Sequence, residues 1–290
     1  MTTAALLLVL ASAFCHSGWN FLLKRSDHKV SFMASSTAVG AAIFLIPAVV
    51  VTIGQGIGWL GLTMCLVTGV LHGVYGLSLS RGYNIGDLSL VYPISRGSAL
   101  AFIPILAVVL LDETISGLAL AGIALVLAGV YSINLDPHAL RDVLAPLRAL
   151  GGPTGRAALL TGVLIATYSL WDKRALDEVS PITLNKFAMV GHVFVLSPVM
   201  LVDGGRRARA EWRLNWKLIL IAGVLTPMAY LLILAALTTS EVAYIAPSRE
   251  IGIVFGTVLG AVILHEAYGA MRVAATLLIV AGVFLLAVAP

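Results

Sequence analysis

Two matching stretches decide the fold of this chain: Tyr92-Pro93-Ile94-Ser95-Arg96 and Tyr244-Ile245-Ala246-Pro247-Ser248-Arg249. Both arginines follow a serine and a nearby proline, both lie inside long apolar stretches, and they are 153 positions apart. Other segments share this separation: Glu113 with Glu266, and Ala128-Gly129-Val130 with Ala281-Gly282-Val283. The sequence is therefore an internal duplication with an arginine in the apolar part of both copies, where a charged side chain is costly and indicates a function.

The composition is that of an integral membrane protein. Hydrophobic residues make up 60% of the chain and charged residues 11%, whereas a soluble protein has about 25% charged residues. The net charge of +4 is spread over short loops and does not indicate nucleic-acid binding. Both cysteines, Cys15 and Cys65, lie in apolar segments and predict no disulfide framework. The first apolar segment has no basic n-region, so we interpret it as a retained span rather than a signal peptide.

The apolar segments predict ten membrane-spanning helices, because about 20 helical residues cross a bilayer and helices satisfy their own backbone groups in lipid. They cover residues 3–23, 31–53, 58–79, 86–110, 115–134, 157–177, 181–202, 216–237, 241–264 and 268–289. A linker at 135–156 separates a first repeat, 1–134, from a second, 157–290. An odd number of spans per repeat turns the second copy upside down. The predicted fold is therefore an all-α integral membrane protein with ten transmembrane helices as two inverted five-helix repeats.

Loop charges predict the orientation, because lysine and arginine concentrate in cytoplasmic loops. The even-numbered loops hold two basic residues, Lys173 and Arg174. The odd-numbered loops, including the basic loop at 203–215, hold twelve: Lys24, Arg25, Lys29, Arg81, Arg141, Arg148, Arg156, Arg206, Arg207, Arg209, Arg213 and Lys217. We therefore expect cytoplasmic odd loops and both termini outside the cytoplasm.

The chain resembles the EamA branch of the drug/metabolite transporter superfamily over nearly its whole length. The resemblance rests on two repeats of five spans, on Trp19-Asn20 with Lys24 ending the first span, and on acidic residues closing each fourth span, at Asp112-Glu113 and His265-Glu266. It implies a transporter with a central cavity between the repeats, for amino acids, metabolites, drugs or nucleotide-sugar-like solutes. Many family members look cytoplasmic at both ends, so the orientation predicted here departs from the family.

The two arginines are the first candidates for substrate binding. Arg96 and Arg249 lie about ten and eight residues into their helices, or about 15 and 12 Å deep. Each follows a proline, and transporters place substrate sites at broken helices. Two guanidinium groups facing one cavity suit a carboxylate or phosphonate. The alternative is a structural ion pair, for which Glu250 and Asp172 are available carboxylates; Glu250 is also a candidate proton carrier.

Aromatic and histidine residues provide the remaining candidates. His16, Trp19 and Asn20 share one helix face, and His72 and Tyr75 share another. Four further rings complete the predicted substrate-binding set: Tyr92, Trp171, Tyr230 and Tyr244. Rings can wall a cavity or hold an ammonium by cation–π attraction, but tryptophan and tyrosine also form interfacial belts. A Gly252-xxx-Gly256-xxx-Gly260 row predicts close helix packing, with dimerisation as the alternative.

We predict a secondary transporter of the inner membrane that moves a small polar metabolite by alternating access. The arginines favour a substrate with a carboxylate or phosphonate, such as an amino acid or organic acid. Two alternatives remain: an exporter of organic cations or drugs with an aromatic cage and a membrane carboxylate, and a membrane enzyme or scaffold with a structural polar core. No phosphate loop, zinc-protease motif or nucleophile elbow occurs. We expect no catalytic residue, cofactor, metal or nucleic-acid partner; the partners are the substrate and the lipid bilayer. Proton coupling and a monomeric or homodimeric state are left open.

Overall fold

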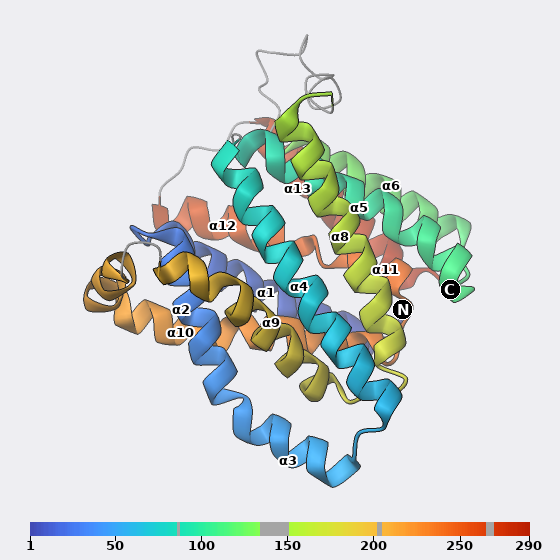
Figure 1. Cartoon of the computed structure of the whole chain (residues 1–290). Helices are drawn as coiled ribbons and strands as arrows, with labels where there is room; N and C mark the ends of the chain where they lie inside the picture. Colours follow the sequence, from blue (N-terminus) through green and yellow to red (C-terminus); the bar gives the residue numbers. More distant parts are fainter. Residues whose placement is uncertain (86–87, 134–150, 202–204, 265–269) are drawn as a thin grey trace.

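The computed structural model describes residues 1–85, 88–133, 151–201, 205–264 and 270–290, and within these ranges the regular secondary structure is helical (Figure 1). The helices of the first half are α1 (Thr3–Lys24), α2 (Lys29–Ile43), α3 (Leu45–Gln55), α4 (Trp59–Ile85), α5 (Leu88–Leu111) and α6 (Gly117–Ser132). Those of the second half are α8 (Pro153–Ala175), α9 (Pro181–Leu201), α10 (Arg206–Leu237), α11 (Val242–Ser248), α12 (Ile251–Leu264) and α13 (Ala270–Val288).

Many of these helices are suited to cross a membrane. Among the described residues, six segments are long and apolar enough to span one, and the bent pair α2 and α3 makes a seventh. The helix α6 is apolar but has only 16 residues, and α8 and α9 carry several polar side chains. The chain is thus a multi-pass membrane protein, and the number of ten spans stays a prediction.

The predicted span at 31–53 is wrong in one respect, because it is two helices rather than one. The helices α2 and α3 meet at Phe44 with a bend of 46°. Pro47 lies in the first turn of α3, where its ring would clash with the carbonyl of Ile43 in a continuous helix. The Lys186 side chain, from α9, donates to the Ala41 carbonyl near this break. An apolar pattern does not record such a bend, so sequence alone predicted a single span.

Two predicted helix starts are also corrected. The helix α8 begins at Pro153, inside the predicted linker, and proline suits the first helical position because it has no N–H to satisfy. The helix α10 begins at Arg206, so most of the predicted basic loop is helical up to a kink at Asn215. Arginine, alanine, glutamate and leucine favour helix whether or not they face lipid. The charge of this segment was therefore a poor guide to its backbone. The rest of the predicted linker, 134–150, lies outside the described residues.

Contacts between helices follow a two-fold pattern. If α1, α2, α4, α5 and α6 correspond to α8, α9, α10, α11/α12 and α13, exchanging the halves maps one contact onto another. The contact of α1 with α10 maps onto that of α8 with α4, and the contact of α5 with α8 maps onto that of α12 with α1. The contacts of α2 with α9 and of α6 with α13 map onto themselves. The duplication read from the sequence is therefore repeated in the packing.

Glycines allow the closest of these contacts. A Cβ built on Gly191 of α9 would lie 1.9 Å from the carbonyl oxygen of Gly69 in α4. The equivalent contact joins α2 and α10, where a Cβ on Gly40 would lie 2.6 Å from the carbonyl oxygen of Gly223. Small residues let membrane helices approach backbone to backbone. Lipid supplies no hydrophobic driving force for helix association, so the van der Waals contacts of this close packing take its place. These two contacts hold the halves together on both sides of the pseudo-axis.

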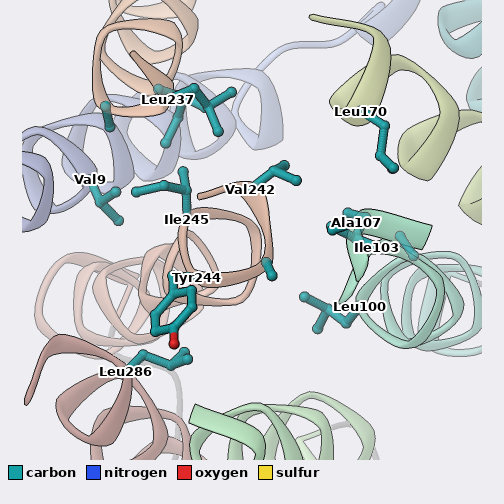
Figure 2. Packing of buried hydrophobic residues seen from close by; sticks show 14 of the residues in the cluster. Val9, Leu100, Ile103, Ala107, Leu170, Leu237, Val242, Tyr244, Ile245 and Leu286 are labelled. Carbon is teal, nitrogen blue, oxygen red and sulfur yellow. The ribbon is translucent and has the colours of Figure 1, made fainter. Parts of the chain in front are cut away.

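The short helix α11 lies at the centre of the main apolar cluster. Figure 2 shows Tyr244 and Ile245 of α11 between Val9 of α1 and Leu286 of α13, with Val242 to their right, and all of these side chains are buried. The Glu113 carboxylate, in the loop after α5, accepts hydrogen bonds from the backbone N–H groups of Val242 (2.7 Å) and Ala243 (2.9 Å). An acidic residue that follows α5 of the first half therefore caps a helix of the second half. Its repeat counterpart, Glu266, lies outside the described residues.

Candidate substrate-binding cavity

A cavity of about 140 Å³ lies between the two halves of the bundle. Its walls come from α1, α2, α4 and α5 of the first half and from α8, α9 and α10 of the second. Arg249, between α11 and α12, completes it. Because both copies of the duplication contribute, the cavity is placed where a movement of one half against the other would change its access.

Arg96 and Arg249 both line this cavity, but their surroundings differ. The Arg96 Nη1 atom lies 3.3 Å from Glu250 Oε1, and the two side chains are only 11% and 6% exposed. This ion pair neutralises the first arginine. Within the described part of the chain, the Arg249 guanidinium has no hydrogen-bond or ion-pair partner of its own. Arg249 is a half-buried cation on the cavity wall, and the neighbouring Glu250 carboxylate is paired with Arg96 instead, so the Arg249 guanidinium is suited to an anionic ligand.

The backbone around the two arginines also differs. Arg249 and Glu250 interrupt the helix between α11 and α12, whereas α5 continues past Arg96 to Leu111. Pro247 stands two residues before the break. The sequence predicted a broken helix in both halves, and the structure has one in the second half. In the first half the prediction is wrong: α5 is uninterrupted and packs against α8.

One wall of the cavity carries a buried hydrogen-bonded cluster around Asp172. Asp172 Oδ2 lies 2.9 Å from His72 Nε2 and also accepts a hydrogen bond from the Tyr230 hydroxyl. Asp172 Oδ1 accepts from Thr68 Oγ1 at 2.6 Å. The carboxylate is only 1% exposed. It is therefore saturated by donors from α4 and α10, and His72 and Tyr230 rather than Asp172 face the cavity.

Aromatic rings form much of the remaining wall. Trp19 and His16 lie edge to face on α1, with ring centroids 5.2 Å apart and the indole N–H directed at His16 Nδ1. Tyr75 packs edge to face against Tyr168, with centroids 5.3 Å apart. Tyr168 also stacks on His72 at 4.3 Å. Such rings give an apolar boundary with polar edges, which suits a small solute that is partly apolar.

The structure brings together seven of the twelve predicted site residues. The cavity is lined by Arg96, Arg249, His16, Trp19, His72, Tyr75 and Tyr230. Their role in binding stays a prediction.

The other five predicted residues lie elsewhere. The Asn20 amide donates to the His16 carbonyl of its own helix, and the Trp171 indole donates to the Met64 carbonyl at 3.1 Å. The Tyr244 hydroxyl donates to the Pro290 carbonyl at 3.1 Å, away from the cavity. Glu250 pairs with Arg96 beside the cavity rather than on it. The side chain of Tyr92 lies outside what the structure describes.

Several cavity residues are absent from the predicted substrate-binding set. Tyr168, Asn185, His192 and Thr226 all line the cavity. The signal for Asn185 and His192 was their polarity within a predicted span, but a polar residue in a span marks a helix interface as often as a site. Among the described residues, no group of three or more histidine, cysteine, aspartate or glutamate side chains is arranged to hold a metal ion.

Comparisons with known proteins agree with this architecture. A helical membrane bundle with a cavity of aromatic and charged side chains between duplicated halves defines a membrane transporter class, and the model of the EamA-like transporter family matches residues 3–135 and 156–288. The chain therefore belongs to the EamA-like transporter family, within the drug/metabolite transporter superfamily. A solved crystal structure is similar in fold, with a TM-score of 0.75 at 14% identity over 98% of this chain and 96% of that chain. None of the curated proteins matches the sequence.

Proposed function

We propose that this protein is a secondary transporter of the inner membrane that moves a small polar metabolite with a carboxylate or phosphonate group. Arg249 carries the proposal, because it is a cation on the cavity wall whose guanidinium has no ion-pair partner among the described residues. An arginine fork binds planar and tetrahedral anions with two parallel hydrogen bonds. An anion bound there would also pair this half-buried charge within the membrane.

Alternating access is the transport mechanism that we propose for this fold. Two five-span repeats of opposite orientation would explain the exchange symmetry of the helix contacts. The cavity lies between these halves, so rocking one half against the other would open it first to one side and then to the other.

The main alternative is an exporter of organic cations. The rings of Trp19, Tyr75 and Tyr230 favour it, because aromatic faces attract a substituted ammonium. Such a cage also needs a carboxylate, and Asp172, which contacts the Tyr230 hydroxyl, is occupied by three side-chain donors. Arg249 on the same wall would repel a cation. The charge distribution therefore favours an anionic group.

Substitution of Arg249 separates the two functions. We expect Arg249→Lys to weaken binding of a carboxylate or phosphonate by about 1.5–3 kcal/mol, because the charge stays but the planar fork is lost. Arg249→Gln should weaken it further. Affinity is measured on the monodisperse, folded fraction, against a panel of amino acids, organic acids, alkylphosphonates and quaternary amines.

The matched control is Arg174→Gln, which removes an arginine that is 55% exposed and pairs only distantly with Asp177. It should leave affinity unchanged. A quaternary amine that binds Arg249→Gln more tightly than the parent would show that the anion proposal is wrong and the cation alternative right. Unchanged affinity with lower stability in both Arg249 variants would favour a purely structural role.

Protons are the coupling ion that we propose to test first. His72 is hydrogen-bonded to Asp172 and Tyr230 on the cavity wall, and chains of such side chains relay protons in transporters. Proteoliposomes given either a pH gradient or a sodium gradient would show which one drives accumulation. They would also separate a transporter from a membrane enzyme or scaffold, which would show no substrate movement with either gradient.

A further inference from the structure

We propose that Asn185 and Thr226 form a second subsite of the cavity that receives a hydrogen-bond-donating group of the substrate. This inference rests on the proposed function. It narrows the substrate to an acid that also carries a hydroxyl or a protonated amine. Both residues line the cavity, Asn185 from α9 and Thr226 from α10, and Asn185 bonds to the carbonyl of Pro227, the residue after Thr226.

Asn185 presents a carbonyl oxygen whose direction is fixed. Its Nδ2 atom donates to the Pro227 carbonyl at 3.2 Å, which holds the amide in one orientation. The Oδ1 atom has no hydrogen-bond partner in the described part of the chain, although the residue is only 1% exposed. A buried carbonyl oxygen without a donor loses free energy, so it is an atom that a ligand can satisfy.

Thr226 differs from other helical threonines of this protein. A threonine inside a helix commonly donates to the carbonyl four residues earlier. Thr63, Thr167 and Thr276 do so, with distances of 2.8–2.9 Å. The buried Thr226 hydroxyl has no such partner among the described residues and lies on the cavity wall. Two polar atoms of cavity residues are thus left without partners among the described residues.

The available partners define the ligand chemistry. An amide oxygen only accepts hydrogen bonds, and a hydroxyl can accept a second one while donating elsewhere. The group that fits both is a donor, such as a hydroxyl or an ammonium. Arg249 on the same cavity only donates and fits the acid. A 2-hydroxy acid and a 2-amino acid both present this combination.

Matched acids that differ in one substituent test the subsite. The probes are propionate, lactate and alanine, together with 3-phenylpropionate, 3-phenyllactate and phenylalanine. We expect the parent to bind a hydroxy or amino acid about tenfold or more tightly than the acid without the donor, the scale of one hydrogen bond to a buried acceptor. Preference for the amino acid identifies an ammonium, and preference for the hydroxy acid identifies a hydroxyl; either supports the proposal.

Thr226→Val is the decisive variant, because it keeps the shape and removes only the hydroxyl. It should reduce the preference severalfold, leave affinity for the unsubstituted acid unchanged, and not lower the melting temperature, since no intramolecular hydrogen bond is lost. Asn185→Ala should reduce the preference as well. Thr167→Val is the control, because it removes a hydroxyl from an exposed site outside the cavity. It should change neither the preference for the substituted acids nor the affinity for the unsubstituted acid.

Equal binding of all three acids of a series by the parent would overturn the subsite and leave the proposed function intact. Retention of the full preference in both Thr226→Val and Asn185→Ala would also overturn it, as would an equal loss of affinity for all three acids. If none of the six acids binds the parent, the subsite fails, and the wider panel of organic acids and alkylphosphonates decides the proposed function.

Discussion

At the scale of the residue, duplication has given two arginines with different chemistry. Arg96 and Arg249 occupy equal positions in their repeats, but the residue after Arg249 is Glu250, whereas the residue after Arg96 is Gly97. The single carboxylate pairs with the arginine of the other repeat. The second half therefore supplies Glu250 as the partner of Arg96 in the first half, and Arg249 is left on the cavity wall.

A double-mutant cycle tests the Arg96–Glu250 pair. Glu250→Gln and Arg96→Gln should each destabilise the protein by about 3 kcal/mol, because each leaves one buried charge without its partner. The double variant should cost less than the sum of the two. Stability is measured by reversible unfolding in mixed detergent micelles. Additive costs would mean that the two side chains do not interact, contrary to the structure.

Part of the cavity could be predicted from residues alone. Intramembrane charge identified Arg96 and Arg249, and helical spacing grouped His16 with Trp19 and His72 with Tyr75. The spacing does not say which neighbour a helix face meets. For that reason Trp171 and Tyr244 were expected at the cavity, whereas they bond to backbone carbonyls elsewhere. The unpartnered atoms of Asn185 and Thr226 can be recognised only once the surrounding helices are in place.

At the scale of the element, crossings between the halves depend on glycine. Gly69 and Gly191 join α4 to α9, and their repeat counterparts, Gly223 and Gly40, join α10 to α2. Repeated Gly69-Val70-Leu71 and Gly223-Val224-Leu225 segments were visible in the sequence. Their partners on α2 and α9 were not, because a glycine in an apolar helix gives no indication of which helix approaches it.

Gly191→Ala should disrupt the α4–α9 crossing. The added Cβ would lie 1.9 Å from the Gly69 carbonyl oxygen, so the two backbones must separate. We expect a loss of stability of about 1–3 kcal/mol or more, the cost of overpacking. Thermal inactivation in detergent measures it. Gly97→Ala is the control, since its Cβ would meet no atom within 4 Å, and alanine favours helix by about 1 kcal/mol. Equal stability of the two variants would contradict the described crossing.

At the scale of the whole molecule, both termini lie at one end of the bundle (Figure 1). The Thr2 N–H donates to Ser240 Oγ at 3.4 Å, and the Pro290 carbonyl accepts from the Tyr244 hydroxyl. Lys173 Nζ donates to the Leu237 and Ser240 carbonyls at the same end. An even number of spans brings the termini to one side, in agreement with the predicted topology.

The side of the membrane follows from the loop charges. Twelve basic residues on odd loops and two on even loops predict that Pro290 is outside the cytoplasm. A fluorescent reporter that matures only in the cytoplasm should therefore be dark when fused after Pro290. The same reporter fused to a chain that ends at Arg148, in an odd loop, should be bright. A bright fusion at Pro290 would reverse the orientation.

The most direct test of the whole account is substrate movement by the purified protein. Proteoliposomes loaded with an unlabelled acid from the binding panel should take up the labelled acid with saturable kinetics. Arg249→Gln should abolish this exchange, and an excess of a quaternary amine should not inhibit it. No uptake above that of empty liposomes, or uptake of a quaternary amine that Arg249→Gln leaves undiminished, would contradict an anion transporter built around Arg249.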